Sequence, residues 1–179
     1  MQTEEAVVEE EVVEVDTDTV VVLFSDTAVE ALVKHIAARF ETCVIGKLGD
    51  FQTIEHAQDK IMSYKHVIFA HEGMVFDFDV ADKMVAKLDS NQVYGCVFSD
   101  YVQSVNRLPI PRLRRSYKKS KNAEDNKLIP IFGAVFSEDL TPIVLSELIH
   151  ATTISTDSFF QTDFDNHVPY HTPDFMFAV

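Results

Sequence analysis

The sequence predicts a single α/β domain with a mostly parallel sheet and helices on both faces. The chain has 179 residues, a usual length for one domain, and 46% of them are apolar, which is enough to form a core. Short β-branched or apolar runs alternate four times with segments of helical periodicity. Because strands joined by right-handed helical crossovers lie parallel, this alternation predicts a mostly parallel sheet.

The first two strand and helix pairs are predicted from local patterns. Residues 20–24 form an all-apolar, β-branched run, which is typical of a strand covered on both faces. A Ser-Asp-Thr turn with capping chemistry follows, and residues 28–40 carry an apolar stripe at helical spacing. Residues 42–45 predict a second buried strand, and residues 54–62 predict a second helix.

The later elements follow the same logic. Residues 66–70 predict a third strand, 80–88 a third helix and 93–98 a fourth strand. After a polar, proline-containing stretch, residues 128–136 return as a strand. Residues 141–149 then predict a helix, because Thr-Pro at its start puts proline in the first turn, where its missing N–H costs nothing.

The sequence predicts three parts of the chain, and charge distinguishes an acidic end and a basic loop. Residues 1–18 carry eight acidic side chains with no Lys or Arg and predict an acidic N-terminal arm. Residues 19–165 form the α/β domain, within which 101–127 make a basic surface excursion, and 166–179 form a C-terminal tail. A net charge of −14 argues against general nucleic-acid binding, which needs a basic surface. The arm and the basic loop instead predict a protein partner or a homo-oligomer.

Location and thiol chemistry are predicted from what the sequence lacks. No apolar run approaches the roughly 18 residues needed to span a bilayer, and the acidic N-terminus is unlike a secretory signal. We therefore expect a cytoplasmic protein, or one assembled into a particle made in the cytoplasm. Cys43 and Cys96 lie in apolar strands and are expected to be buried free thiols.

In parallel α/β sheets, ligands bind beyond the carboxyl ends of the strands. The polar residues expected there are Ser25 and Asp26 after the first strand, Asp50 after the second, His71 and Glu72 after the third, and Asp100 after the fourth.

In their order, these segments resemble the family 2 glycosyltransferases and their GT-A fold, over roughly residues 19–165. The apolar run 20–24 with its Ser-Asp-Thr turn is similar to the opening strand of the family and its nucleotide-contacting turn. Residues 64–80 are similar to the metal-bearing strand with its apolar link and helix, and 97–101 to a strand-end Ser-Asp-Tyr. The resemblance implies a UDP-sugar donor bound by Ser25, Asp26, Asp50 and Asp100.

The metal motif of the family is degenerate here. Where it has Asp-x-Asp, this chain has His71, Glu72 and Gly73, and glycine offers no ligand. His71 and Glu72 are the candidate ligands for a weak Mn²⁺ or Mg²⁺ site. A literal Asp-Phe-Asp occurs at 77–79, where first-turn acids that cap a helix are the simpler interpretation.

The resemblance also implies a late carboxylate that deprotonates the acceptor. Asp157 is the candidate catalytic base, the pair at 138–139 competes with it, and helix capping explains Asp157 equally well. Arg114 and Arg115 are candidates to clamp the donor diphosphate, since guanidinium forks match phosphate, or they belong to a solvated loop. The histidines at 167 and 171 are expected to be surface or partly buried side chains.

Two functions remain open from the sequence. The first is an inverting nucleotide-sugar transferase, and the second is an inactive GT-A-fold structural or adaptor subunit of a larger assembly, such as a virus particle. An open cleft lined by Asp26, Asp100 and Asp157 would favour the enzyme. A nucleotide-binding regulator is a weaker third alternative, because the glycine-rich phosphate-binding motifs are absent.

Overall fold

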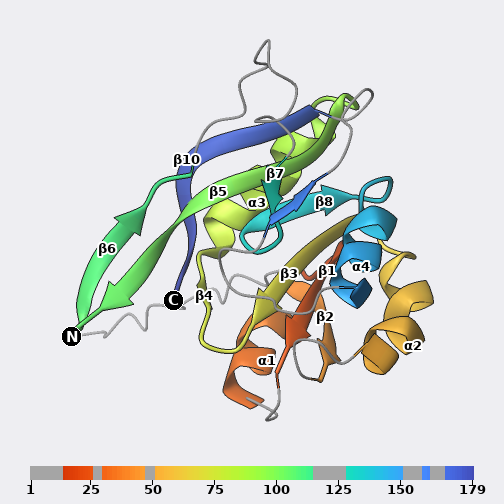
Figure 1. The fold of residues 1–179 in the computed structure, drawn as a ribbon, viewed down its shortest axis with the longest axis horizontal. Coiled ribbons are helices and arrows are strands. Elements are labelled where there is room, and N and C mark those ends of the chain that lie inside the picture. The colour runs from red at the N-terminus through yellow and green to blue at the C-terminus, as the bar shows by residue number, and fades with distance from the viewer. Residues whose placement is uncertain (1–13, 26–29, 47–50, 115–127, 151–158, 162–167) are drawn as a thin grey trace, which may run out of the picture.

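The computed structural model describes residues 14–25, 30–46, 51–114, 128–150, 159–161 and 168–179 (Figure 1). This part of the chain contains four helices and ten strands. The helices are α1 (Glu30–Ala37), α2 (Phe51–Ile61), α3 (Phe78–Asp89) and α4 (Thr141–His150). The strands are β1 (Asp16–Phe24), β2 (Phe40–Ile45), β3 (His66–His71), β4 (Val75–Phe76), β5 (Tyr94–Val105), β6 (Leu108–Arg112), β7 (Leu128–Pro130), β8 (Ala134–Ser137), β9 (Phe159–Gln161) and β10 (Val168–Ala178).

The predicted mostly parallel sandwich with helices on both faces is wrong. The main sheet has the order β2-β1-β3-β8-β5-β10-β4, with β6 paired to β5, and it is mixed. Strands β1, β2 and β3 are parallel, as are β5 and β10, but β8 runs antiparallel to both of its neighbours. Helices are few, and the sheet curls so that β6 and the second half of β5 extend away from them (Figure 1).

Two positive-φ turns explain part of the departure. The predicted strand 128–136 is split by Gly133, whose φ of +74° turns the chain between β7 and β8. The strand predicted to end at residue 98 continues to Val105 and turns back as β6. Asn106 and Arg107 in this turn have φ values of 52° and 67°, the two positive φ angles that a type I′ hairpin requires.

Most locally patterned elements lie where the sequence predicts them. The first three strands, α3 and α4 overlap their predicted ranges, although α1 is shorter and Phe40 belongs to β2. The cap interpretation of residues 77–79 is confirmed, because the Asp77 carboxylate accepts a 3.1 Å hydrogen bond from the Val80 N–H at the start of α3. The apolar faces meet in a core in which Phe69, Phe132 and Phe136 are fully buried.

Strand β6 lies at an edge of the sheet and is protected from further pairing. Pro109 and Pro111 are two residues apart, so their nitrogens face the same side of the strand. Proline has no N–H to donate and is tolerated in a strand where that side is not part of the ladder. The outer edge of β6 therefore has no N–H donors at these positions, which blocks the addition of another strand there.

Replacing Arg107 with glycine is expected to stabilise the protein by about 0.5–1 kcal/mol. A non-glycine residue at a φ of 67° is strained, and Asn-Gly is the preferred pair for this turn. Urea denaturation at pH 7 measures the difference in free energy of unfolding. Arg112→Gly is the control within β6, where glycine weakens a strand, and a gain in stability from that variant too would contradict the explanation.

The C-terminal segment takes part in the sheet. Strand β10 pairs in parallel with β5, although bulges interrupt its register, and it pairs antiparallel with β4. Among the described residues, no helix is long and apolar enough to cross a membrane. The predicted boundaries at 18/19 and 165/166 stay predictions.

Candidate functional site

The ends of β1 and β3 are joined by a polar contact at the carboxyl-end edge of the sheet. The Ser25 hydroxyl donates a 3.0 Å hydrogen bond to the Glu72 carboxylate. The Glu72 N–H donates to the Phe24 carbonyl at 3.0 Å, which extends the ladder between the two parallel strands. Ser25 is buried, whereas Glu72 is exposed, so a carboxylate held by a buried hydroxyl faces solvent at this edge.

The chain turns sharply after β3. Gly73 has a φ of +88°, and the Met74 N–H donates to the His71 carbonyl at 3.2 Å, which closes a turn that needs a residue tolerant of positive φ. The His71 ring nitrogen Nδ1 lies 2.6 Å from the Glu72 carbonyl, and its ring packs edge-on against Phe132 at a centroid distance of 5.0 Å. These contacts fix the direction of the His71 ring.

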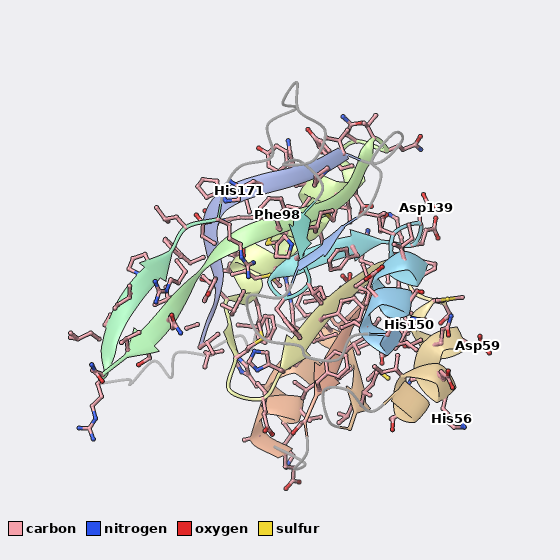
Figure 2. All side chains as sticks on the ribbon, viewed as in Figure 1. His56, Asp59, Phe98, Asp139, His150 and His171 are labelled. Atoms are coloured by element: carbon pink, nitrogen blue, oxygen red, sulfur yellow. The ribbon has the colours of Figure 1, made fainter. Side chains whose placement is uncertain are left out.

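The sequence predicted Asp100 just after a strand, but the residue lies inside β5. Its carboxylate is 2% exposed, and Oδ1 accepts two hydrogen bonds, from the Arg114 N–H at 2.6 Å and from His171 Nε2 at 2.9 Å. The His171 ring also lies against Phe98, with centroids 5.1 Å apart, and the two side chains lie close together in Figure 2. Asp100 therefore ties β10 and the chain after β6 to the middle of β5.

The Arg114 side chain is held by the backbone and by aromatic rings. Its Nη1 donates to the carbonyls of Ser99 at 3.0 Å and Phe132 at 2.8 Å. Its guanidinium carbon lies 4.9 Å from the centroid of the Tyr101 ring and 5.6 Å from that of Phe177. These four contacts within the chain fix the position of the guanidinium group.

Phe132 connects the two groups of polar residues. Its ring contacts His71 on the β3 side, and its carbonyl accepts from Arg114 on the β5 side. We call this set the edge cluster and define it as Ser25, His71, Glu72, Asp100, Arg114 and His171. Five of its residues were predicted from the sequence as site residues, whereas His171, the hydrogen-bond partner of Asp100, was not.

The structure does not describe four of the predicted site residues. Asp26, Asp50, Arg115 and Asp157 lie outside the described residues, so their roles stay predictions. The competing pair at 138–139 follows β8, which is antiparallel to β3, and its neighbour Ser137 pairs with His66 at the start of β3. This pair is therefore at the edge opposite Glu72, and Figure 2 shows Asp139 near α4, away from His171.

The described residues do not fit a metal site. No group of three His, Cys, Asp or Glu side chains that could hold an ion occurs among them. Glu72 and the His71 ring supply two donors at most, whereas Mg²⁺ and Mn²⁺ prefer about six, mostly oxygen. Asp77 is already used as a helix cap.

Both cysteines are free and buried, as predicted. Burial raises the pKa of the Cys43 thiol and raises that of Cys96 further, since Cys96 is fully enclosed in β5. A protonated thiol is a poor nucleophile and a poor metal ligand. Cysteine chemistry at the edge cluster is therefore not indicated.

Comparisons with known proteins leave the family open. No family model matches the chain, and no curated protein matches it. Among solved structures, it is similar to the crystal structure of A197 from STIV, with 16% sequence identity and a TM-score of 0.43, over 91% of this chain and 82% of that chain.

Proposed function

We propose that the protein is a glycosyltransferase-like domain that binds a nucleotide sugar, such as a UDP-sugar, at the edge cluster. The observation that carries this proposal is the contact between Ser25 and Glu72 at the carboxyl ends of adjacent parallel strands. Ligands of α/β sheets bind at such ends. An exposed carboxylate oriented by a buried hydroxyl suits the hydroxyl groups of a ribose or a sugar.

The proposed chemistry is an inverting transfer. A base, for which Asp157 stays the candidate, takes the proton of an acceptor hydroxyl, and the oxygen forms a bond to the anomeric carbon of the sugar. The bond from that carbon to the diphosphate breaks, and the nucleoside diphosphate leaves with the electron pair.

Two free thiols are consistent with a reducing compartment, so a cytoplasmic location is part of this proposal.

Titration calorimetry with UDP and UDP-glucose tests the binding. We expect binding without a metal, and little strengthening by Mn²⁺, because the described residues do not build an ion site. Glu72→Gln and Ser25→Ala are each expected to weaken binding about tenfold, which corresponds to about 1.4 kcal/mol. Glu138→Gln is the matched control, since it removes an exposed carboxylate at the opposite edge.

If Glu72→Gln and Ser25→Ala leave the affinity for UDP unchanged, the nucleotide binds at a place other than the edge cluster. No binding to any nucleotide by the folded protein would contradict the proposal and favour the second candidate, a structural or adaptor subunit of a larger assembly. One observation supports that candidate already. Asp100 and Arg114 make their hydrogen bonds within the chain, so they serve the fold without a ligand.

A further inference from the structure

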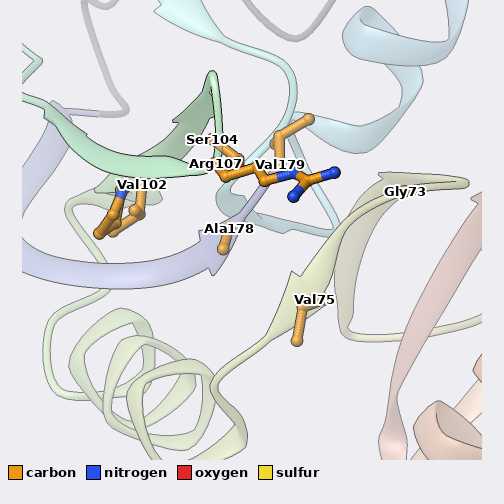
Figure 3. Close-up of a pocket in the computed structure, with 8 residues that line it drawn as sticks. Gly73, Val75, Val102, Ser104, Arg107, Ala178 and Val179 are labelled. Atoms are coloured by element: carbon orange, nitrogen blue, oxygen red, sulfur yellow. The ribbon is translucent and has the colours of Figure 1, made fainter.

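A small pocket lies between the β5–β6 hairpin, β4 and the end of β10 (Figure 3). Its volume is about 340 Å³, which is at the low end of the range for sites that hold small molecules. None of the residues that line it belongs to the edge cluster. The pocket is therefore separate from the proposed nucleotide-sugar site.

One face of the sheet supplies the apolar wall of this pocket. Val102 of β5 pairs with Ala178 of β10, and Ala178 pairs with Val75 of β4. Directly paired residues point to the same face of a sheet, so these side chains form an aliphatic row across three neighbouring strands. Pro109 of β6, which pairs with Ser104, extends the wall. Val75 is 63% exposed, so no described part of the chain covers that end of the row.

Arg107 brings a positive charge to the apolar wall. Figure 3 shows its side chain reaching from the hairpin turn to the pocket, beside Val179. Its guanidinium group makes no ion pair with any residue that the structure describes. Residues 101–112, which form the hairpin, contain no Asp or Glu. The charge of Arg107 is therefore complementary to an anionic group that a ligand supplies.

The backbone of Arg107 also points to a role for its side chain. A φ of 67° is strained for a residue with a side chain, and glycine is preferred at this position of the hairpin turn. Strained residues of this kind are frequent where a ligand is held. A guanidinium group binds a carboxylate through two N–H groups at once, which glycine cannot do.

Two further residues of the lining suit the same anionic group. Ser104 lies two residues after Val102, so its hydroxyl is on the same face of β5 and can donate to a carboxylate oxygen. No atom lies within 4 Å of the position that a Cβ of Gly73 would take. The lining at Gly73 therefore leaves space for a ligand.

We propose that this pocket binds a short aliphatic carboxylate. The carboxylate pairs with Arg107 and accepts a hydrogen bond from Ser104. The carbon chain lies on Val75, Val102 and Ala178, and its burial stabilises the complex by removing apolar surface from water. A membrane of anionic lipids is a poorer source of the same chemistry, because a protein with a net charge of −14 is repelled by its surface.

Titration of the full ¹⁵N-labelled chain with hexanoate at constant ionic strength tests this binding. The amide NMR signals of Val75, Val102 and Ala178 are expected to shift and to saturate, with a dissociation constant of about 1 mM or lower. Hexanol lacks the charge and acetate lacks the chain, so each is expected to bind at least about tenfold more weakly than hexanoate.

Two pairs of variants separate the contributions of charge and of apolar contact. Arg107→Gln is expected to weaken hexanoate binding about tenfold, and Arg112→Gln, on the same hairpin, is the matched control. Val75→Ser is expected to weaken it about fivefold. Its control is Val93→Ser, since Val93 is 50% exposed and does not line the pocket. The amide spectra of the variants also report whether they are folded.

Each outcome decides the proposal. The absence of saturable shifts with hexanoate would overturn it, as would equal binding of hexanol, because Arg107 would then have no role. Equal losses in Arg107→Gln and Arg112→Gln would also overturn it, since they would reflect the total charge of the hairpin. Shifts with phosphatidylglycerol vesicles but none with hexanoate would assign this face to a membrane surface instead.

Discussion

Gly133→Ala is expected to destabilise the protein by about 2–4 kcal/mol. Gly133 has a φ of +74°, a conformation that costs about 1 kcal/mol for a residue with a side chain. A Cβ at this position would overlap the Phe177 ring and lie 2.8 Å from Arg114 Nη1. Overpacking of this kind adds a further 1–3 kcal/mol. Urea denaturation, followed by circular dichroism, measures the loss.

The neighbours of Gly133 cannot move aside at little cost. The Phe177 ring stacks on Tyr101, with centroids 5.0 Å apart and an interplanar angle of 0°. Arg114 is fixed by its hydrogen bonds to the carbonyls of Ser99 and Phe132. Displacing either side chain would disturb the place where β5, β8 and β10 meet.

Gly73→Ala is the matched control for this prediction. Gly73 has a φ of +88°, so it carries the same backbone strain, but no atom lies within 4 Å of the position that its Cβ would take. Its cost is expected to be about 1 kcal/mol. Equal losses in the two variants would show that the close packing around Gly133 contributes nothing.

Local patterns predicted the elements well but could not predict how they pair. The run 66–70 and the run 128–136 are both apolar and β-branched or aromatic, so either direction of pairing buries them equally. The antiparallel register of β8 depends on pairs such as His66 with Ser137, which are far apart in the sequence. Assuming helical crossovers throughout therefore gave a parallel sheet, where the structure has a mixed one.

The tail was missed as a strand for a related reason. Residues 168–178 contain Pro169 and Pro173 and alternate poorly, which is not typical of an inner strand. Their pairing with β5 is irregular, with several shifts of register, and these shifts accommodate the prolines.

The candidate site was predictable only where strand ends define it. Ser25 and Glu72 follow adjacent parallel strands, and the rule for strand ends predicts that they lie together, as the structure shows. Asp100 was expected at the same edge as a ligand-facing group, but its strand continues past it. No local signal relates it to His171, which is 71 residues away and becomes its neighbour only through β10.

Asp100→Ala is expected to cost about 3 kcal/mol of stability. The carboxylate is 2% exposed and accepts hydrogen bonds from the Arg114 N–H and from His171 Nε2. A hydrogen bond to a charged group contributes about 1.5–3 kcal/mol, and alanine removes the acceptor of both bonds at once. Asp100→Asn keeps an oxygen at the position of Oδ1 and is expected to cost about half as much or less. Thermal and urea denaturation measure both variants.

A double-mutant cycle separates the structural role of Asp100 from a role in binding. If the carboxylate serves the fold, the stability losses of Asp100→Ala and His171→Ala should not add. The double variant should lose less stability than the sum of the two single variants, by at least about 1 kcal/mol, because both substitutions remove the same hydrogen bond. If it also contacts a ligand, Asp100→Asn should in addition weaken UDP binding by the folded protein. The burial of Asp100 and the short bonds to its Oδ1 favour the first outcome. In that case Glu72, the exposed carboxylate of the edge cluster, is the group that we propose contacts the nucleotide.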